Sequence, residues 1–67
     1  MAVARVTEIV ASSEVSFDDA VRQAVDRAGR TLRGMTGLKI LEQKAKIEEG
    51  KIVEFRVHAS ITFVLDD

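Results

Sequence analysis

The clearest pattern in the chain is a strict alternation of apolar and polar residues over positions 52 to 65. Every odd-numbered position there is apolar: Val53, Phe55, Val57, Ala59, Ile61, Phe63 and Leu65. The positions between them are mostly polar or charged and include Arg56 and His58. Because successive side chains of a strand point to opposite faces of a sheet, this alternation predicts one long strand with an apolar face and a polar face.

A second pattern has the period of an α-helix. Its apolar residues recur at intervals of three and four: Phe17, Ala20, Val21, Ala24, Val25, Ala28 and Leu32. Such a stripe predicts an amphipathic helix. Ser16 is a suitable N-cap, because its hydroxyl can accept a hydrogen bond from a free backbone N–H, and Asp19 can reach back as in a capping box. Gly34 is the residue expected just after the end of this helix.

Two further segments are expected to be strands. Residues 2 to 11 are rich in valine and isoleucine, which favour strands. Val6 and Val10 share one face of this segment, and Ile9 points to the other. Residues 2 to 11 precede the predicted helix in the sequence, and the long strand at residues 52 to 65 follows it.

Residues 38 to 48 form the remaining expected strand, in which the apolar positions change parity near Leu41. A β-bulge would explain the change, and a long twisted strand that serves two surfaces would explain it equally. Glu49 and Gly50 form the expected hairpin turn, because glycine readily adopts positive φ. The fold class is therefore α+β, in the order β-α-β-β, with a three-stranded antiparallel sheet and one helix on its apolar face.

The length of 67 residues is enough for a single domain, residues 1–67, with one small core. A chain this short buries only about 60% of the surface that its unfolded form exposes. Small domains therefore usually need disulfides, a metal or partner subunits. Because the sequence has no cysteine and only one histidine, disulfides and thiolate zinc sites are excluded, and self-association is the expected source of added stability.

The charge of the chain is nearly balanced, with ten Lys and Arg against eleven Asp and Glu. Lys39, Lys44, Lys46 and Lys51 make one strand mildly basic, but a sheet that binds nucleic acid usually exposes aromatic rings, and all three phenylalanines lie in the apolar stripes. No apolar run approaches the roughly 18 residues of a membrane helix, and no signal peptide is recognisable. We therefore expect no nucleic-acid or membrane partner and a cytoplasmic location.

Little catalytic chemistry is visible in the sequence. It contains no phosphate-binding glycine loop, no zinc-protease motif and no nucleophile elbow. His58 lies on the polar face of its strand, where we expect a solvent- or interface-facing side chain rather than a general base. Without a nucleophile–base pair, we expect no catalytic residue and no enzyme.

Acidic residues offer the only candidates for a cation site. Asp66 and Asp67 form an acidic pair that we expect to be a frayed chain end. Glu42, Glu48 and Glu49 would join a divalent-cation site only if symmetry brought copies of the chain together. No metal site is therefore predicted.

Taken together, these segments resemble the dodecin family. The resemblance runs from Val3 to Asp66 without an obvious gap. Its most specific parts are the pattern A-V-D-R-A-x-x-T-L, at Ala24 to Leu32, and the pattern F-x-L-[DE], which begins at Phe63. Dodecins are small β-α-β-β subunits whose sheet wraps around one helix, and twelve of them form a hollow shell. The resemblance therefore implies a hollow homododecamer, in which the chain is its own partner.

The resemblance also implies a ligand. Dodecins sequester flavins (riboflavin, FMN or FAD) in pairs at subunit interfaces, and they are regarded as storage or protective buffers. Carried over by resemblance, the ligand contacts of this chain are Thr36, Gly37, Leu38, Glu42 and Arg56.

Two of these positions depart from the pattern of flavin-binding dodecins. Gly37 stands where the family carries a tryptophan, in a pattern like L-x-W-F-E-V, and Arg56 stands where it carries a glutamine. Glycine has no ring to stack on a flavin, and arginine has hydrogen-bond donors only. We therefore expect flavin binding to be weakened or lost. A turn that requires glycine is the alternative reason for Gly37, and Arg56 would either bind an anion or pair with Glu54 of a neighbour or with Glu42.

Three functions remain open at this stage. The first is a dodecin-like shell that stores a small molecule, with weakened flavin binding. The second is a flavin-free shell that holds a phosphate-bearing coenzyme, another anion or a divalent cation. The third is a purely structural interaction module without a ligand. A yellow purified protein would favour the first function, and a colourless one would favour the other two.

Overall fold

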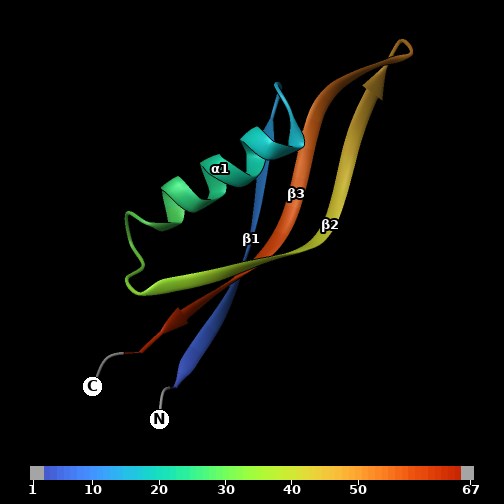
Figure 1. Ribbon diagram of the computed structural model, residues 1–67. Helices are drawn as coiled ribbons and strands as arrows, with labels where there is room; N and C mark the ends of the chain where they lie inside the picture. The colour runs from blue at the N-terminus through green and yellow to red at the C-terminus, as the bar shows by residue number, and fades with distance from the viewer. Residues whose placement is uncertain (1–2, 66–67) are drawn as a thin grey trace.

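Four elements make up residues 3–65, the part of the chain that the computed structural model describes. They are β1 (Ala4–Ser13), α1 (Phe17–Ala28), β2 (Met35–Glu48) and β3 (Lys51–Val64). The strands form one antiparallel sheet in the order β1-β3-β2, and the helix lies across one face of it (Figure 1). The α+β class and the β-α-β-β order that the sequence predicts are thus confirmed.

The core lies between α1 and the middle of β3. Val57, Ala59 and Ile61, on the odd-numbered face of β3, are each 1% exposed. Phe17 of the helix meets Phe55 edge to face, with 5.0 Å between the ring centroids. A helix of 12 residues is about 18 Å long, whereas β3 has 14 residues and a much longer span. The predicted apolar face is therefore confirmed, but only its middle is fully buried.

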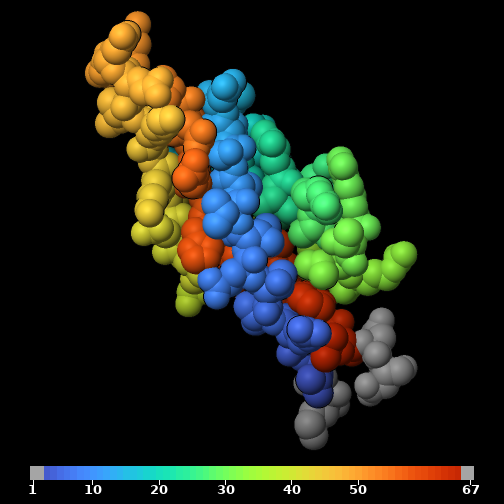
Figure 2. Space-filling view, turned by 180° about the vertical axis from the view of Figure 1, so that it is seen from behind, coloured from blue at the N-terminus to red at the C-terminus, as the bar shows by residue number. Residues whose placement is uncertain are grey.

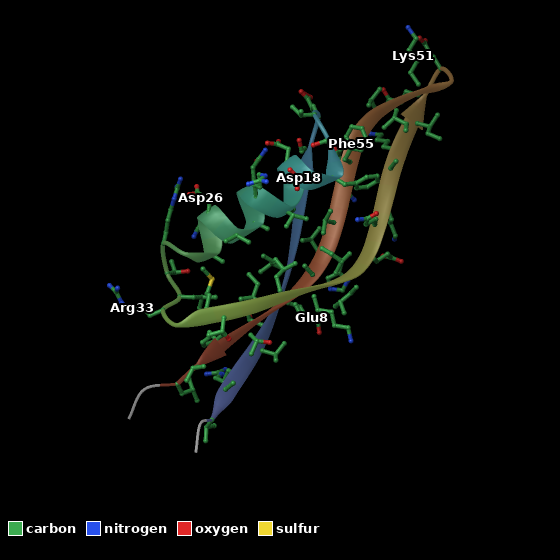
Figure 3. The ribbon with its side chains drawn as sticks, viewed as in Figure 1. Glu8, Asp18, Asp26, Arg33, Lys51 and Phe55 are labelled. Atoms are coloured by element: carbon green, nitrogen blue, oxygen red, sulfur yellow. The ribbon has the colours of Figure 1, made fainter. Side chains whose placement is uncertain are left out.

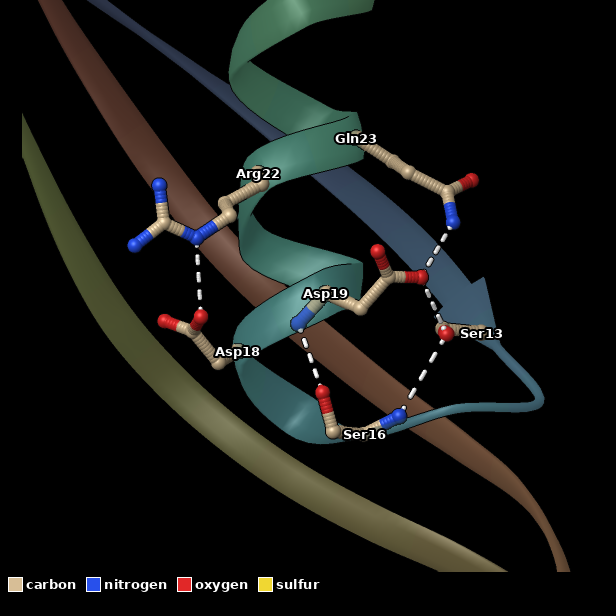
Figure 4. Close-up of polar contacts among 6 residues, drawn as sticks. All are labelled: Ser13, Ser16, Asp18, Asp19, Arg22 and Gln23. Atoms are coloured by element: carbon tan, nitrogen blue, oxygen red, sulfur yellow. Dashed lines mark hydrogen bonds and ion pairs between the residues drawn. The ribbon is translucent and has the colours of Figure 1, made fainter.

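The helix begins where the sequence predicts. The Ser16 hydroxyl accepts a hydrogen bond from the N–H of Asp19 at 2.9 Å. The predicted capping box is wrong, because the Asp19 carboxylate instead accepts hydrogen bonds from the Ser13 hydroxyl at 2.5 Å and from Gln23 at 2.6 Å (Figure 4). These two hydrogen bonds lower the pKa of Asp19, because they favour its charged form. The hydrogen bond from Ser13 also ties the end of β1 to the helix.

The helix ends at Ala28, six residues before the predicted Gly34. Gly29 is the C-cap, and glycine weakens a helix by about 1 kcal/mol relative to alanine. The apolar Leu32 therefore lies in the loop after the helix, although its N–H still donates to the Ala28 carbonyl at 2.8 Å. Gly34 has φ 74° and a Cβ there would lie 2.8 Å from the Val64 carbonyl oxygen. This close approach of the loop to β3 is what requires glycine.

The strand boundaries differ from the sequence prediction by up to three residues. β1 ends at Ser13 rather than at position 11, and β2 begins at Met35 rather than at position 38. The register of β2 against β3 shifts between Ile40 and Glu42, so the bulge expected near Leu41 is confirmed. The bulge lets one strand present apolar side chains to two different surfaces.

A single subunit is more extended, and exposes more surface, than a compact folded chain of the same length. Its radius of gyration is 13.9 Å, against about 11 Å for a compact chain of this length. Its accessible surface of 5181 Å² exceeds the area expected for its mass by about 1,000 Å². Figure 2 shows the β2–β3 hairpin extending past the rest of the subunit. Large apolar side chains remain exposed at Val3, Val6, Val10, Val15, Leu41, Ile47 and Ile52.

Candidate functional site

The first three predicted ligand residues lie together at the start of β2. They belong to a hollow of about 270 Å³, which is lined by Val25, Met35, Thr36, Gly37, Leu38 and Ile61. A side chain added at Gly37 would meet no atom within 4 Å, and Gly37 is not among the glycines with positive φ. Gly37 lies in extended strand opposite Thr62. The alternative of a turn that requires glycine is therefore wrong at this position.

The other two predicted ligand residues lie on the face of the sheet that points away from α1. Glu42 of β2 is paired with His58 in the strand register, and Arg56 is paired with Lys44. The shallow hollow between them has a volume of about 220 Å³ and is lined by Val10, Glu42, Lys44, Arg56 and His58. Glu42 and Arg56 thus border one site, although they make no ion pair with each other.

The ion pair of Arg56 runs along its own strand. Its guanidinium donates to the carboxylate of Glu54, two residues earlier, at 2.6 Å. The sequence predicted Glu54 of a neighbouring copy or Glu42 of the adjacent strand, and within this subunit Glu42 pairs with Lys44 at 3.4 Å instead. Residues two apart in a strand point to the same face of the sheet, so Arg56 and Glu54 can pair without help from another strand.

His58 pairs with Glu8 of β1, which the sequence did not indicate. The Nε2 atom of His58 lies 2.8 Å from the Oε1 atom of Glu8. His58 is partly exposed on the polar face, where the sequence predicts a solvent- or interface-facing side chain. Each basic residue that borders this hollow (Lys44, Arg56 and His58) therefore already has a carboxylate beside it. The hollow carries no surplus of positive charge that would attract a free anion.

The two hollows are far apart within one subunit. Gly37 lies opposite Thr62, which is six residues beyond Arg56 on β3. At about 3.3 Å per strand residue, this separation is about 20 Å. A compact small molecule cannot contact both Gly37 and Arg56 of the same copy, so a site that uses both must take them from different copies.

Metal-binding chemistry has little support within one subunit. In residues 3–65, no group of three or more His, Asp or Glu side chains could hold a metal ion. Glu48 pairs with Lys46 at 3.4 Å, and Asp66 and Asp67 lie outside the described residues. In the same range, no helix is long and apolar enough to cross a membrane.

The sequence also did not indicate a hollow of about 500 Å³ between α1 and β1. Ile9, Ala24 and Ala28 contribute apolar lining, and Gln23 and Arg27 contribute polar side chains. Its signal in the sequence is the pair of alanines one helical turn apart, because small side chains leave space beside a neighbouring strand. None of the predicted ligand residues lies there.

Comparison with known proteins connects this subunit to one family. The family described as dodecin matches residues 3–66 of the chain. No curated protein sequence matches the chain. Dodecin from Streptomyces coelicolor is 35% identical and superimposes with a TM-score of 0.92 over 98% of this chain and 94% of that chain.

Two further solved structures extend the comparison. An arginine-to-alanine variant of the Thermus thermophilus dodecin is 28% identical, with a TM-score of 0.94 over 100% of both chains. Calcium dodecin from Mycobacterium tuberculosis, a calcium-chelating antigen, is 26% identical, with a TM-score of 0.81 over 96% of this chain and 91% of that chain.

The family properties agree with what the sequence implied about chemistry. Dodecins form homododecamers that bind small ligands, flavins among them, and the family is made of binding proteins that are not enzymes. Since the family match spans nearly the whole chain and the subunit fold agrees with solved dodecins throughout, this chain belongs to the dodecin family.

Proposed function

We propose that this chain, as one domain over residues 1–67, forms a cytoplasmic homododecameric shell that stores a small molecule and binds flavins more weakly than flavin-binding dodecins do. Family membership supports the shell. The excess surface of about 1,000 Å² per subunit and the exposed apolar residues at both edges of the sheet support it independently. A subunit with such an open core is stabilised most simply by copies of itself.

The ligand site of this proposal lies between copies. Thr36, Gly37 and Leu38 of one copy would contribute the ring-binding part, and Glu42 and Arg56 of another copy would contribute the polar part. The separation of about 20 Å between Gly37 and Arg56 along β3 supports a shared site, because one copy cannot offer both groups to a compact ligand.

The observation that carries the weakened flavin binding is the open space at Gly37. Apart from its chain neighbours, no atom lies within 4 Å of the position of a Cβ there, so Gly37 supplies no ring for a flavin to stack on and no other side chain fills the position. Stacking on an aromatic side chain contributes about 1–3 kcal/mol per ring. Arg56 adds to the effect, because it cannot accept a hydrogen bond and is held by Glu54.

Riboflavin titration tests the proposal. We expect weak binding by the wild type and a gain of roughly tenfold or more in the Gly37→Trp, Arg56→Gln double variant, from about 1–3 kcal/mol of stacking per ring. Quenching of riboflavin fluorescence measures the binding. The Gly37→Leu, Arg56→Gln double variant is the matched control, because leucine fills the same space without a ring. It should gain much less than the tryptophan variant.

Two results would contradict this assignment of the site. Tight riboflavin binding by the wild type would show that another surface binds the flavin. An intact assembly of the double variant without any gain would show that Gly37 and Arg56 are not ligand positions. Native mass spectrometry of each variant separates these results from a loss of assembly.

Calcium is a second candidate ligand. The observation in its favour is the similar structure from Mycobacterium tuberculosis, which is that of a calcium-chelating protein with a calcium-binding site. Glu42 and Glu48 would have to leave their lysine partners to bind the ion. If calcium is the ligand, calcium chloride raises the unfolding temperature of the wild type by mass action, and magnesium chloride and riboflavin do not.

A further inference from the structure

The hollow of about 500 Å³ between α1 and β1 has the size of a ligand site. We refer to it as the α1–β1 hollow. Sites for small molecules have volumes of about 300–1,000 Å³, with a mainly apolar lining and a few polar groups. Neither Gly37 nor Arg56 lines this hollow. A ligand bound there would therefore be independent of the flavin positions.

The sheet supplies an apolar floor for the α1–β1 hollow. Ile9 and Ala11 of β1 are paired with Ala59 and Val57 of β3, and residues directly opposite in antiparallel strands share one face of the sheet. Ala59 is 1% exposed beneath the helix, whereas its partner Ile9 is only partly buried. The lining from Thr7 to Ala11 is about 13 Å long. The floor is thus long enough for an alkyl chain and is not fully covered by the helix.

The polar part of the lining contains one charge. Among the described residues that line the α1–β1 hollow, Arg27 is the only ionisable one, and it lies in the last turn of the helix. That position favours a cation because of the helix dipole, but it uses none of the hydrogen-bond donors of the guanidinium. Arginine has five such donors and no acceptor, so the lining of the hollow attracts an anionic group.

No acidic side chain of the subunit satisfies Arg27. Two aspartates of the helix lie on the side of α1 that points away from the sheet (Figure 3), and each pairs with an arginine one turn later; the pairs are Asp18–Arg22 and Asp26–Arg30. Within residues 3–65, Arg27 takes part in no ion pair. Its charge is therefore available to a ligand.

We propose that the α1–β1 hollow binds a small amphipathic carboxylate, of the kind of a medium-chain fatty acid. The carboxylate pairs with the guanidinium of Arg27, whose planar geometry suits two parallel hydrogen bonds. The alkyl chain lies along Ile9, beside Ala24 and Ala28 of the helix. One arginine matches the single charge of a carboxylate, and the apolar floor matches an alkyl chain better than a sugar or a nucleotide.

A pair of ligands that differ only in charge tests the inference. Sodium octanoate and octanol share an alkyl chain, and isothermal titration calorimetry on the intact protein measures the binding of each. Arg27→Gln removes the cation and keeps a long polar side chain. Arg30→Gln is the matched control, because it changes the net charge equally at the same end of the helix, whereas Arg30 pairs with Asp26 and does not line the hollow.

We expect the wild type to bind octanoate more tightly than octanol. Arg27→Gln should weaken octanoate binding roughly tenfold or more, the usual effect of losing a hydrogen bond between charged groups, and should leave octanol binding unchanged. Arg30→Gln should bind both ligands as the wild type does. The inference is overturned if the wild type binds no octanoate, if it binds octanol equally well, or if the two variants lose octanoate affinity equally.

A second variant tests the apolar floor. Ala11→Leu places a larger side chain in the α1–β1 hollow and should weaken the binding of octanoate and octanol alike. Ala4→Leu is its control, since Ala4 is exposed on the same strand and does not line the hollow. Unchanged affinities in a folded Ala11→Leu variant would place the ligand elsewhere and overturn the inference.

Competition with riboflavin separates this site from the proposed flavin site. Octanoate affinity should be the same with and without saturating riboflavin, and Arg27→Gln should leave riboflavin binding unchanged. Displacement of octanoate by riboflavin would show one shared site and would overturn the inference. A wild type that binds octanoate but no riboflavin would instead limit the proposed function and leave the α1–β1 hollow as the binding site.

Discussion

The two faces of β3 are held in different ways. The face toward α1 buries Val57, Ala59 and Ile61 almost completely, and apolar burial contributes about 25 cal/mol per Å². The opposite face carries the Arg56–Glu54 ion pair and the His58–Glu8 hydrogen bond, both partly exposed, and exposed polar pairs of this kind contribute about 0–1 kcal/mol each. The stability of the subunit therefore depends mainly on one face, and residues of the other face can change at little cost to the fold.

The largest difference in the free energy of unfolding should appear between two alanine variants at neighbouring positions, one on each face of β3. Ile61→Ala should lower the free energy of unfolding by about 2–5 kcal/mol, because it leaves a cavity against the helix. Thr62→Ala, on the opposite face, should stay within about 0.5 kcal/mol. Urea unfolding of both variants at one subunit concentration provides the measurement. Similar losses in the two variants would mean that both faces are buried in the assembled protein.

Two glycines sharpen the comparison at the level of the backbone. Gly34→Ala should destabilise the protein by more than about 1 kcal/mol, since alanine is strained at positive φ and its Cβ would lie 2.8 Å from the Val64 carbonyl oxygen. Gly37→Ala should stabilise it by about 0.4–1 kcal/mol, because extended backbone and open space accept a side chain. Thermal unfolding should show shifts of opposite sign. A loss at Gly37 would reveal a neighbouring copy packed against that position.

The smallest effect concerns the hydrogen bond between Glu8 and His58 on the face away from α1. In a double-mutant cycle with Glu8→Gln and His58→Gln, the coupling energy should be about 0.2–1 kcal/mol, as for other exposed pairs. A coupling well above this range would show that the pair is buried between subunits.

Local features of the fold were predictable from the sequence. The N-cap at Ser16, the bulge at Leu41 and the alternation of β3 depend on residues close together in the chain. The end of the helix was not predictable from periodicity, because the stripe continues to Leu32 while Gly29 weakens the helix before it. The spacing of apolar residues does not reflect how much a single glycine destabilises a helix, so it does not predict where the helix ends.

The sequence could indicate candidate residues for the site, but it could not predict how those residues are arranged in space. The sequence indicated Gly37 and Arg56, but their separation along β3 follows from the strand register. The contact of His58 with Glu8 joins residues 50 positions apart, and only the pairing of β1 with β3 brings them together. Long-range pairings of this kind depend on the tertiary fold, so they were not visible in the sequence.

The pairing of β1 with β3 also decides where attached segments would go. Ala4 is paired with Val64, and the N–H of Leu65 donates to the Val3 carbonyl oxygen at 2.9 Å, so both ends of the described chain leave the sheet at one point (Figure 1). In a closed shell of identical copies, these points all lie at one radius. Cargo proteins fused before β1 or after β3 would therefore emerge on the same side of the wall, either all in the lumen or all on the outer surface.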